Sequence, residues 1–500
     1  MHPRTLCLTA CAALVASAAL SGCVMDGPFV SADIDKLVSK DSAVAWSRHG
    51  AEPPVTPLAV PVSLAAAPVD RADTHRAQNV RDSDADRIEP PMSLPLCVDM
   101  ALSKSPVTRA AWESARATAA TVGIADAAYM PDIFFTGEVG PEQDLVGPIR
   151  NQQNLGLAAI GLNWVLMDFG RRDADSARAR AQMIGANYSF NRAMQKLVYE
   201  VQAAYFNLDA KHSLREAARE NVATARKQLD ATEDRMTVGL ATRPEVLQAR
   251  QQFLQANYDL EDAKAAVFGA QARLSVAMGV PADRPCDIVR LSALPLPENL
   301  TTAIDRSIAT ALEQRPDIAA ALSQVRAREE QVKRAEANFL PIISFEGFGG
   351  VSSQNYNVQI APQNTPNDGS STFGNYSAKL TGTWLIFDGY ERAHALQQAR
   401  SEVRAAHASL ENLRLQTTGE VWTGYFEFFA AQKRYEAGVA LLTASQDSYE
   451  SVYQSYLNGL VTINDLLQAE SDLFDSRFEL IKSRAQLLTA SATFVLALGS

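Results

Sequence analysis

The sequence predicts a mainly α-helical protein that also carries membrane β-strands, built from a tandem-duplicated helix–strand–strand–helix–helix unit. The first observation is a heptad repeat that runs from Val238 to Gly279. The second is its return near the C-terminus, where Gly459 and Gly499 repeat Gly239 and Gly279 at one constant offset. The third is a pair of apolar, alternating segments upstream of each heptad region. One body made of two equivalent halves is therefore expected.

Both core positions of the heptad are filled in each copy, which is typical of a coiled coil. In the first copy the large residues are Val246, Phe253, Leu260, Val267 and Leu274, and an alanine follows each by three positions. In the second copy they are Leu466, Leu473, Leu480, Leu487 and Phe494, followed by alanine or serine. Each helix needs an antiparallel partner, and the proline-free stretch 169–237 supplies one for the first copy. The pattern predicts two long helical hairpins per chain.

The tips of these hairpins have a short signature. Gly239, Leu240 and Thr242 recur as Gly459, Leu460 and Thr462. A glycine suits the left-handed residue that ends a helix, and a threonine followed three residues later by an acid forms a capping box. The two tip sequences therefore predict sharp turns.

The strands are expected next to proline and tryptophan. PDIFFTGEVG and PIISFEGFGG each begin a strand, and polar loops at 141–154 and 353–374 lead into a second one. Strands of about ten residues have the length needed to cross a membrane in a barrel. Four strands cannot close a barrel, so subunits must pool them, unless the strands pack as a soluble sheet.

Trp164 and Trp384 end these hairpins, where an aromatic side chain at a membrane interface would lie. Ordinary core packing is the alternative. Four residues after each tryptophan, Asp168 or Asp388 can cap the helix that follows.

The N-terminus has the features of an exported lipoprotein. Residues 1–22 read as a signal peptide that ends at Leu20-Ser21-Gly22-Cys23, which resembles the bacterial lipobox. Cys23 is then the lipidation site, although an ordinary cleavage site with a chance cysteine is the alternative. Val24 favours sorting to the outer membrane. The proline-rich stretch 23–96 predicts an extended tether, with a small folded domain as the alternative.

Composition limits the function classes. The 500 residues carry a net charge of −11 without a basic stripe, which argues against a nucleic-acid partner. The six histidines show no ligand spacing and no nucleophile or phosphate-loop motif is visible, so we expect no enzyme activity, metal or cofactor. The expected divisions are 97–280 and 301–500 for the repeats and 281–300 for a linker.

The doubled tips and the doubled Trp-x-x-x-Asp junctions resemble the TolC family of outer-membrane efflux and secretion channels, and the lipobox resembles its lipoprotein branch. The resemblance covers residues 97 to 499. It implies a homotrimer with a 12-stranded β-barrel in the outer membrane, continuous with a periplasmic 12-helix coiled-coil α-barrel. It also implies that the tips contact a periplasmic adaptor linked to an inner-membrane pump of the RND or ABC type. The first junction departs from the second, because Phe169 precedes Gly170 where Gly389 follows its aspartate directly.

The same resemblance suggests a gate at the tips. Asp465 matches an acidic ring position, and Gln468 stands where the next acid would be. Tyr456 matches the tyrosine of a closing link and Glu245 its acidic partner, while Val461 replaces the arginine of a second link. The alternative is local, since Asp465 and Glu245 each follow a threonine by three and could serve only as capping residues. Tyr456 could likewise be a seam residue.

Two further expectations remain. Only Cys97 and Cys286 persist after export and acylation. In the resembling family the regions that hold them fold together, so the resemblance implies a disulfide between them, although the sequence alone does not fix the pairing. A non-channel coiled-coil structural lipoprotein of the envelope is the alternative function. It leaves the paired strands unexplained. The sequence does not identify the cargo, which could be drugs, metal ions, metabolites or a polypeptide of a type I secretion system.

Overall fold

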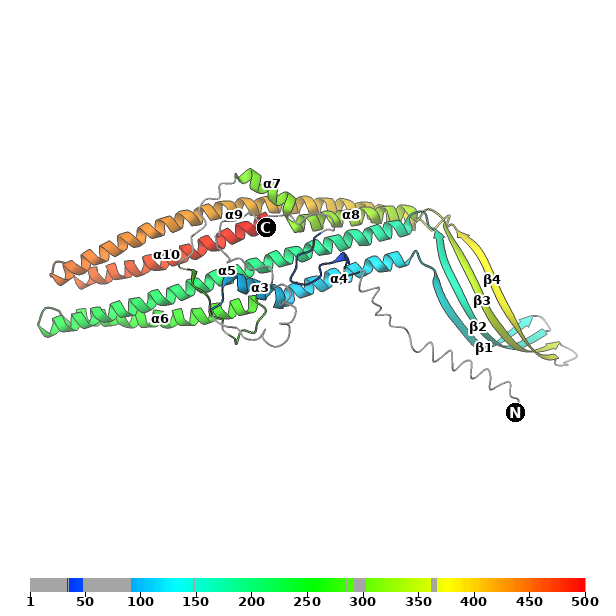
Figure 1. The fold of residues 1–500 in the computed structure, drawn as a ribbon, viewed down its shortest axis with the longest axis horizontal. Helices are drawn as coiled ribbons and strands as arrows, with labels where there is room; N and C mark the ends of the chain where they lie inside the picture. Colours follow the sequence, from blue (N-terminus) through cyan, green and yellow to red (C-terminus); the bar gives the residue numbers. More distant parts are fainter. Residues whose placement is uncertain are drawn as a thin grey trace, which may run out of the picture.

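The computed structural model describes residues 34, 36–47, 91–146, 149–284, 286–291, 303–360 and 367–499. The molecule is long and narrow, with two helical hairpins at one end and a curved sheet at the other (Figure 1). The first unit contains α3 (Leu94–Lys104), α4 (Pro106–Ala127), β1 (Asp132–Val146), β2 (Ile149–Met167), α5 (Arg171–Thr237) and α6 (Arg243–Ala277). The second contains α7 (Ile304–Gln314), α8 (Pro316–Ala337), β3 (Ile342–Ile360), β4 (Asn367–Thr383), α9 (Glu391–Leu457) and α10 (Ile463–Leu498). The expected duplicated unit is confirmed.

The long helices have the predicted extent. α5 and α9 contain 67 residues each, which is ~100 Å at 1.5 Å per residue. α6 packs antiparallel on α5 and α10 packs antiparallel on α9, and α10 also lies against α5, so the two hairpins form one body. On α6 the seam alanines Ala249, Ala256 and Ala270 are buried. Small side chains in alternate layers bring the helices close together.

The two strand-to-helix junctions use the same backbone shape despite different sequences. Phe169 and Gly170 have positive φ angles of 56° and 97°, and Gly389 and Tyr390 have 67° and 71°. Each junction therefore turns through two consecutive left-handed residues, of which one is glycine and the other aromatic. Only the order of the two differs, so the departure seen in the sequence leaves the geometry of the turn intact.

The strands are longer than predicted. They contain 15, 19, 19 and 17 residues, and pairing continues through most of both predicted loops, up to Val146–Ile149 and Val358–Asn367. The loop boundaries 141–154 and 353–374 were therefore wrong. Polar residues ended the predicted strands because apolar alternation stops there, but backbone pairing needs only a partner strand and can continue where both faces are polar.

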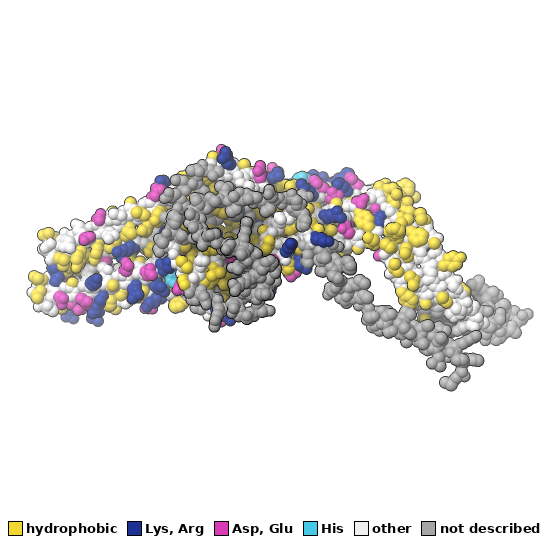
Figure 2. Space-filling model, in the orientation of Figure 1, with side chains coloured by type: hydrophobic (Ala, Val, Ile, Leu, Met, Phe, Trp, Pro, Cys, Tyr) yellow, Lys and Arg dark blue, Asp and Glu magenta, His cyan; other side chains and the backbone are white. Residues whose placement is uncertain are grey.

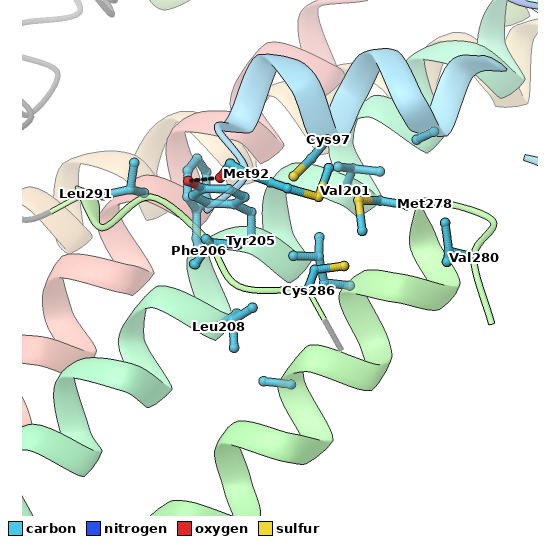
Figure 3. Packing of buried hydrophobic residues seen from close by; sticks show 14 of the residues in the cluster. Met92, Cys97, Val201, Tyr205, Phe206, Leu208, Met278, Val280, Cys286 and Leu291 are labelled. Carbon is cyan, nitrogen blue, oxygen red and sulfur yellow. Dashed lines mark hydrogen bonds between the residues drawn. The ribbon is translucent and has the colours of Figure 1, made fainter. Parts of the chain in front are cut away.

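Among the described residues, the hydrophobic cluster with the most members lies in the middle of the molecule. Met92 and Cys97 from the start of the first unit, Tyr205 from α5, and Cys286 and Leu291 from the segment after α6 belong to it (Figure 3). The hydroxyl of Tyr205 donates to the carbonyl oxygen of Val289 at 2.6 Å and also lies 3.2 Å from that of Met92. The described part of the expected linker, 281–284 and 286–291, thus includes core residues.

Cys97 and Cys286 do not form a disulfide in the structure. Both are free thiols, and both are fully buried. They enter the same cluster from α3 and from the segment after α6 (Figure 3). The sequence-based expectation that these regions meet is satisfied, but the pairing expected of the thiols is absent. The hydroxyl of Ser275 lies 3.5 Å from the Cys286 sulfur instead.

Part of the expected tether is folded. Residues 36–47, which we call the docked segment, lie on α4 and α5. Val38 is buried in a cluster with Ala115, Ala119 and Ala179. The expectation of an extended chain throughout 23–96 was wrong for this stretch, because a single valine that packs into a small hydrophobic cluster leaves no periodic signal in the sequence.

Hydrogen bonds fix the docked segment to both helices. The Asn191 side chain accepts from the Trp46 backbone N–H and donates to the Trp46 carbonyl, both at 2.8 Å. The amide of Asn187 donates to the Leu37 carbonyl at 3.0 Å, and the indole of Trp112 donates to the Ser39 carbonyl at 2.9 Å. These bonds satisfy backbone groups of an irregular segment that has no strand partner.

Within the described ranges, no helix combines the length and the hydropathy required to cross a bilayer. Residues 1–33, including Cys23 and the expected signal peptide, lie outside the described residues.

Candidate functional site

The sheet presents one apolar face and one face that is mostly polar. Register places Trp164, Phe345 and Leu380 opposite one another, which puts them on the same face. One residue along, Glu346 pairs with Lys379, and their charged groups are 2.8 Å apart. Because neighbouring residues of a strand point to opposite faces, the apolar and polar rows lie on opposite sides of one sheet. A wall between lipid and water requires this arrangement.

The apolar face continues along the edge strands and is exposed in the single chain. Tyr376 and Leu380 of β4 and Ile133 and Val139 of β1 are all more than half exposed. Figure 2 shows hydrophobic side chains gathered over the sheet near its helical end, where few charged side chains appear. A soluble sheet would cover this face, since exposed apolar patches mark surfaces that contact lipid or protein.

The strand order is β1-β2-β3-β4, so β1 and β4 are edges. Trp164 and Trp384 lie where the sheet joins the helices, and their indole groups donate to the carbonyl oxygens of Tyr129 and Phe339 at 2.9 and 3.0 Å. Both rings are more than a third exposed, so neither is an ordinary core residue. Their position suits an interfacial ring, which stays a prediction.

At the other end, the tips have the expected caps. Glu245 accepts from the backbone N–H of Thr242 at 3.3 Å, and Asp465 accepts from that of Thr462 at 2.8 Å. Gly239 and Gly459 have left-handed φ angles of 78° and 72°. The leucine that follows each glycine is exposed: Leu240 by 68% and Leu460 by 77%. Each tip therefore presents an apolar side chain on a rigid turn.

The closing link expected from Tyr456 to Glu245 is not formed. The Tyr456 hydroxyl is buried with no hydrogen-bond partner among the described residues, and Glu245 is engaged by Thr242. Arg235 of α5 contacts Tyr456 instead: its guanidinium lies 4.7 Å from the centre of the Tyr456 ring and donates to the carbonyls of Tyr456 and Leu457 at 3.3 Å. Arg235 and Tyr456 therefore join the two hairpins at this point. A gating role for Tyr456 and Glu245 stays a prediction.

Asp465 and Gln468 are exposed, as ring residues would be. Hydrogen bonds from Thr462 lower the pKa of Asp465, so its carboxylate stays charged in the physiological range. Gln468 donates to Asp472 at 2.8 Å. Position 468 lacks the acid that the resemblance implies, but Asp472 lies one turn further along the helix and is hydrogen-bonded to Gln468.

Three residues at the contact between hairpins were missed by sequence reasoning. They are Arg235, Gln228 on α5 and Glu470 on α10. Glu470 occupies the position beside a seam alanine, Ala469, where a heptad usually carries a surface charge. Only the three-dimensional contact between α5 and α10 reveals that it is buried.

The fold, the amphipathic sheet and the capped tips can be compared with known proteins. The family model described as "Outer membrane efflux protein" matches residues 97–280 and 307–500. The chain belongs to this family. It is an outer-membrane channel of the efflux and secretion type, and the TolC-like resemblance is confirmed.

Relatives and solved structures of this family extend over most of the chain. Protein CyaE of Bordetella pertussis is 29% identical over 420 residues, covering 83% of this chain and 85% of that protein. The outer membrane efflux protein BepC of Brucella suis is 23% identical over 76% of this chain and 79% of its own length.

Among solved structures, a membrane protein from Pseudomonas aeruginosa superposes with a TM-score of 0.71 at 22% identity, covering 81% of this chain and 93% of that one. The outer-membrane channel OprN superposes with 0.69 at 19% identity, covering 91% and 99%. At these identities the superpositions establish the fold.

Members of the outer membrane efflux protein family are channels that work with adaptors and inner-membrane pumps. In the part of the chain that the structure describes, no group of three or more histidine, cysteine or acidic side chains could hold a metal ion. The absence of enzyme activity, metal and cofactor stays a prediction.

Proposed function

We propose that three copies of this chain form one exit duct, in which strands cross the outer membrane and helices extend through the periplasm to an adaptor and an inner-membrane pump. The carrying observation is the four-stranded sheet with an apolar and a polar face and two unpaired edges, joined to helices of 67 residues. Open edges are not tolerated in lipid. Pairing β1 of one copy with β4 of the next removes every edge, and three sheets of four strands give a 12-stranded barrel.

The tips are the proposed adaptor contacts. Leu240 and Leu460 are exposed on turns that capping boxes hold rigid. Exposed apolar side chains on ordered turns are suited to a protein partner. The proposed gate lies just behind them, at Tyr456 with Arg235, with the carboxylates of Asp465 facing the axis in the trimer. Three carboxylates near one axis favour cations.

The anchor is the proposed acylated Cys23, in the outer membrane. An envelope lipoprotein without a channel is not favoured, because it has no use for a sheet with opposite apolar and polar faces. In this proposal the pump and the adaptor select the cargo that passes through the channel.

One experiment tests this function. The purified, acylated protein is examined by native mass spectrometry in mild detergent and by conductance in planar bilayers. We expect the mass of three chains and discrete channel steps. A monomer that stays soluble without detergent and conducts nothing would favour the structural lipoprotein.

A further inference from the structure

Three polar side chains are buried without partners where the two hairpins meet. They are Gln228 of α5, Tyr456 of α9 and Glu470 of α10, which are 5%, 4% and 2% exposed. Neither carboxylate oxygen of Glu470, neither amide atom of Gln228 and not the hydroxyl of Tyr456 has a hydrogen-bond partner among the described residues. We call Glu470 and Gln228 the polar layer; Tyr456 lies nearer the tip, where Arg235 contacts it. Such groups are uncommon in folded proteins, and each one calls for an explanation.

Glu470 and Gln228 lie at the same level of the contact between α5 and α10. The two helices are antiparallel, and Arg477 of α10 pairs with Glu220 of α5 at 3.3 Å. Two turns from Arg477 toward the tip lead to Glu470. Two turns from Glu220 toward the tip lead to residues 227 and 228. The polar layer is therefore part of the surface that joins the first hairpin to the second.

Within the described ranges, Glu470 has no ion-pair or hydrogen-bond partner. On α9 the carboxyl of Glu470 is one cause of the raised pKa of Tyr449, after burial. The Tyr449 ring stacks with that of Tyr453, with centroids 6.0 Å apart. On α10 itself, Arg477 forms an ion pair with Glu220, and Asp472 accepts a hydrogen bond from Gln468.

The charged side chains of α5 at the level of Glu470 point to solvent and not toward Glu470. Arg226, Lys227 and Asp230 are exposed, and Arg226 pairs with Asp230 at 3.0 Å and lies over the Phe253 ring of α6. The surroundings of Glu470 therefore favour its neutral, protonated form.

We propose that Glu470 is a proton-controlled latch between the two hairpins, which holds them together while protonated and lets them part when it ionises. This proposal rests on the proposed channel function and adds a regulator to its gate. If opening separates α10 from α5, it exposes Glu470 to water, where a carboxylate is stable. The proton leaves to solvent, and no other reactant is needed.

The direction of the pH effect follows from burial. Desolvation raises the pKa of Glu470 to about 7 from the ordinary value of 4.5. In the closed arrangement the group therefore binds its proton more tightly than it does when exposed. The closed arrangement gains this stabilisation fully below pH 4.5 and loses it as pH rises to about 7. The equilibrium should shift toward opening by up to about tenfold per pH unit in that window, then level off.

The test compares Glu470→Gln with Glu479→Gln in planar bilayers between pH 5 and pH 7.5. Glutamine has the shape of the protonated acid and cannot ionise. Glu479 is the matched control, since it is an exposed acid on the same helix and pairs with Lys482 at 3.1 Å. We expect open probability to rise several-fold from pH 5 to pH 7 in the wild type and in Glu479→Gln. Glu470→Gln should hold the acid-pH value throughout. A wild type without this rise, or a Glu470→Gln channel that keeps it, would overturn the latch.

A distance measurement separates this proposal from the channel function. Spin labels at Lys227→Cys and Asp475→Cys, both exposed positions, report the separation of α5 and α10 by pulsed electron resonance, with Cys97 and Cys286 replaced by alanine. We expect a short, narrow distribution at pH 5, a longer or broader one at pH 7, and no change with pH once Glu470→Gln is added. If the protein conducts nothing, the duct proposal fails while these distances still decide the latch. A separation that ignores pH in the wild type refutes the latch.

Discussion

At the scale of single residues, the link at the tips depends on a ring and a guanidinium and not on a hydroxyl. Arg235 lies 4.7 Å from the centre of the Tyr456 ring, while the Tyr456 hydroxyl has no partner among the described residues. Tyr456→Phe keeps the ring and should leave conductance near wild type. Arg235→Ala removes the stacking and two hydrogen bonds, which together contribute about 1–2 kcal/mol, so open probability should rise several-fold. Single-channel recording measures both.

Arg226→Ala is the control for this comparison. Arg226 also lies over an aromatic ring, that of Phe253, but this contact stays within the first hairpin. The control should conduct like wild type. Equal effects of Arg226→Ala and Arg235→Ala would mean that general loss of charge, rather than the link between hairpins, alters the gate.

The two thiols give a second prediction at this scale. Burial raises the pKa of Cys97 to about 12, with Cys286 a smaller cause, and burial also raises the pKa of Cys286. The thiolate is the reactive form, so neither cysteine should be alkylated in the native protein at pH 8. Unfolding without reductant should expose two reactive thiols, counted by mass spectrometry. Zero thiols on unfolding would reveal a disulfide.

Local patterns predicted residue roles well where the signal lies within a few positions. The Thr-x-x-acid spacing predicted both capping boxes, and both form. The partner of Tyr456 was wrong because it came from a resemblance and depends on residues more than two hundred positions apart. The fold itself followed from heptads and duplication. The burial of Glu470 could not be predicted from the heptads, since a position beside the seam of two helices is buried only when a third helix covers it.

At the scale of elements, the docked segment fixes a piece of the N-terminal region to α4 and α5. Val38 is buried in a hydrophobic cluster of α4 and α5 side chains, so a charge there would be buried without a partner. Val38→Asp should release the segment and expose it to protease, with cleavage between residues 36 and 47. Limited proteolysis followed by mass spectrometry detects this.

Val44→Asp is the matched variant, because Val44 belongs to the same segment and is 55% exposed. Its cleavage pattern should equal that of wild type. If both variants are cleaved alike, or neither is, the docked segment is not held by the Val38 contact.

At the scale of the whole molecule, the docked segment limits where an acylated Cys23 can lie. Asn187 and Asn191 hold the segment 16 to 20 residues after the start of α5 at Arg171, which is ~25–30 Å along the helix. The chain from Cys23 to Lys36 can span at most ~45 Å when fully extended. An anchor at Cys23 can therefore reach the level where the strands join the helices, while the docked segment stays in place.

The same geometry distinguishes a channel from a lipoprotein that is held only by its acyl chains. If the sheet spans the membrane, Cys23→Ser should remove the acyl chains and leave the protein in the outer membrane, because the apolar face of twelve strands binds lipid far more strongly than one anchor does. A protein held only by its anchor would instead be released to the soluble periplasmic fraction. Fractionation of cells that express Cys23→Ser measures the outcome, with Cys97→Ser as a control that keeps the anchor. We expect Cys23→Ser to resist extraction with carbonate or high salt, and its release as a soluble protein would refute the assignment of β1 to β4 as membrane strands.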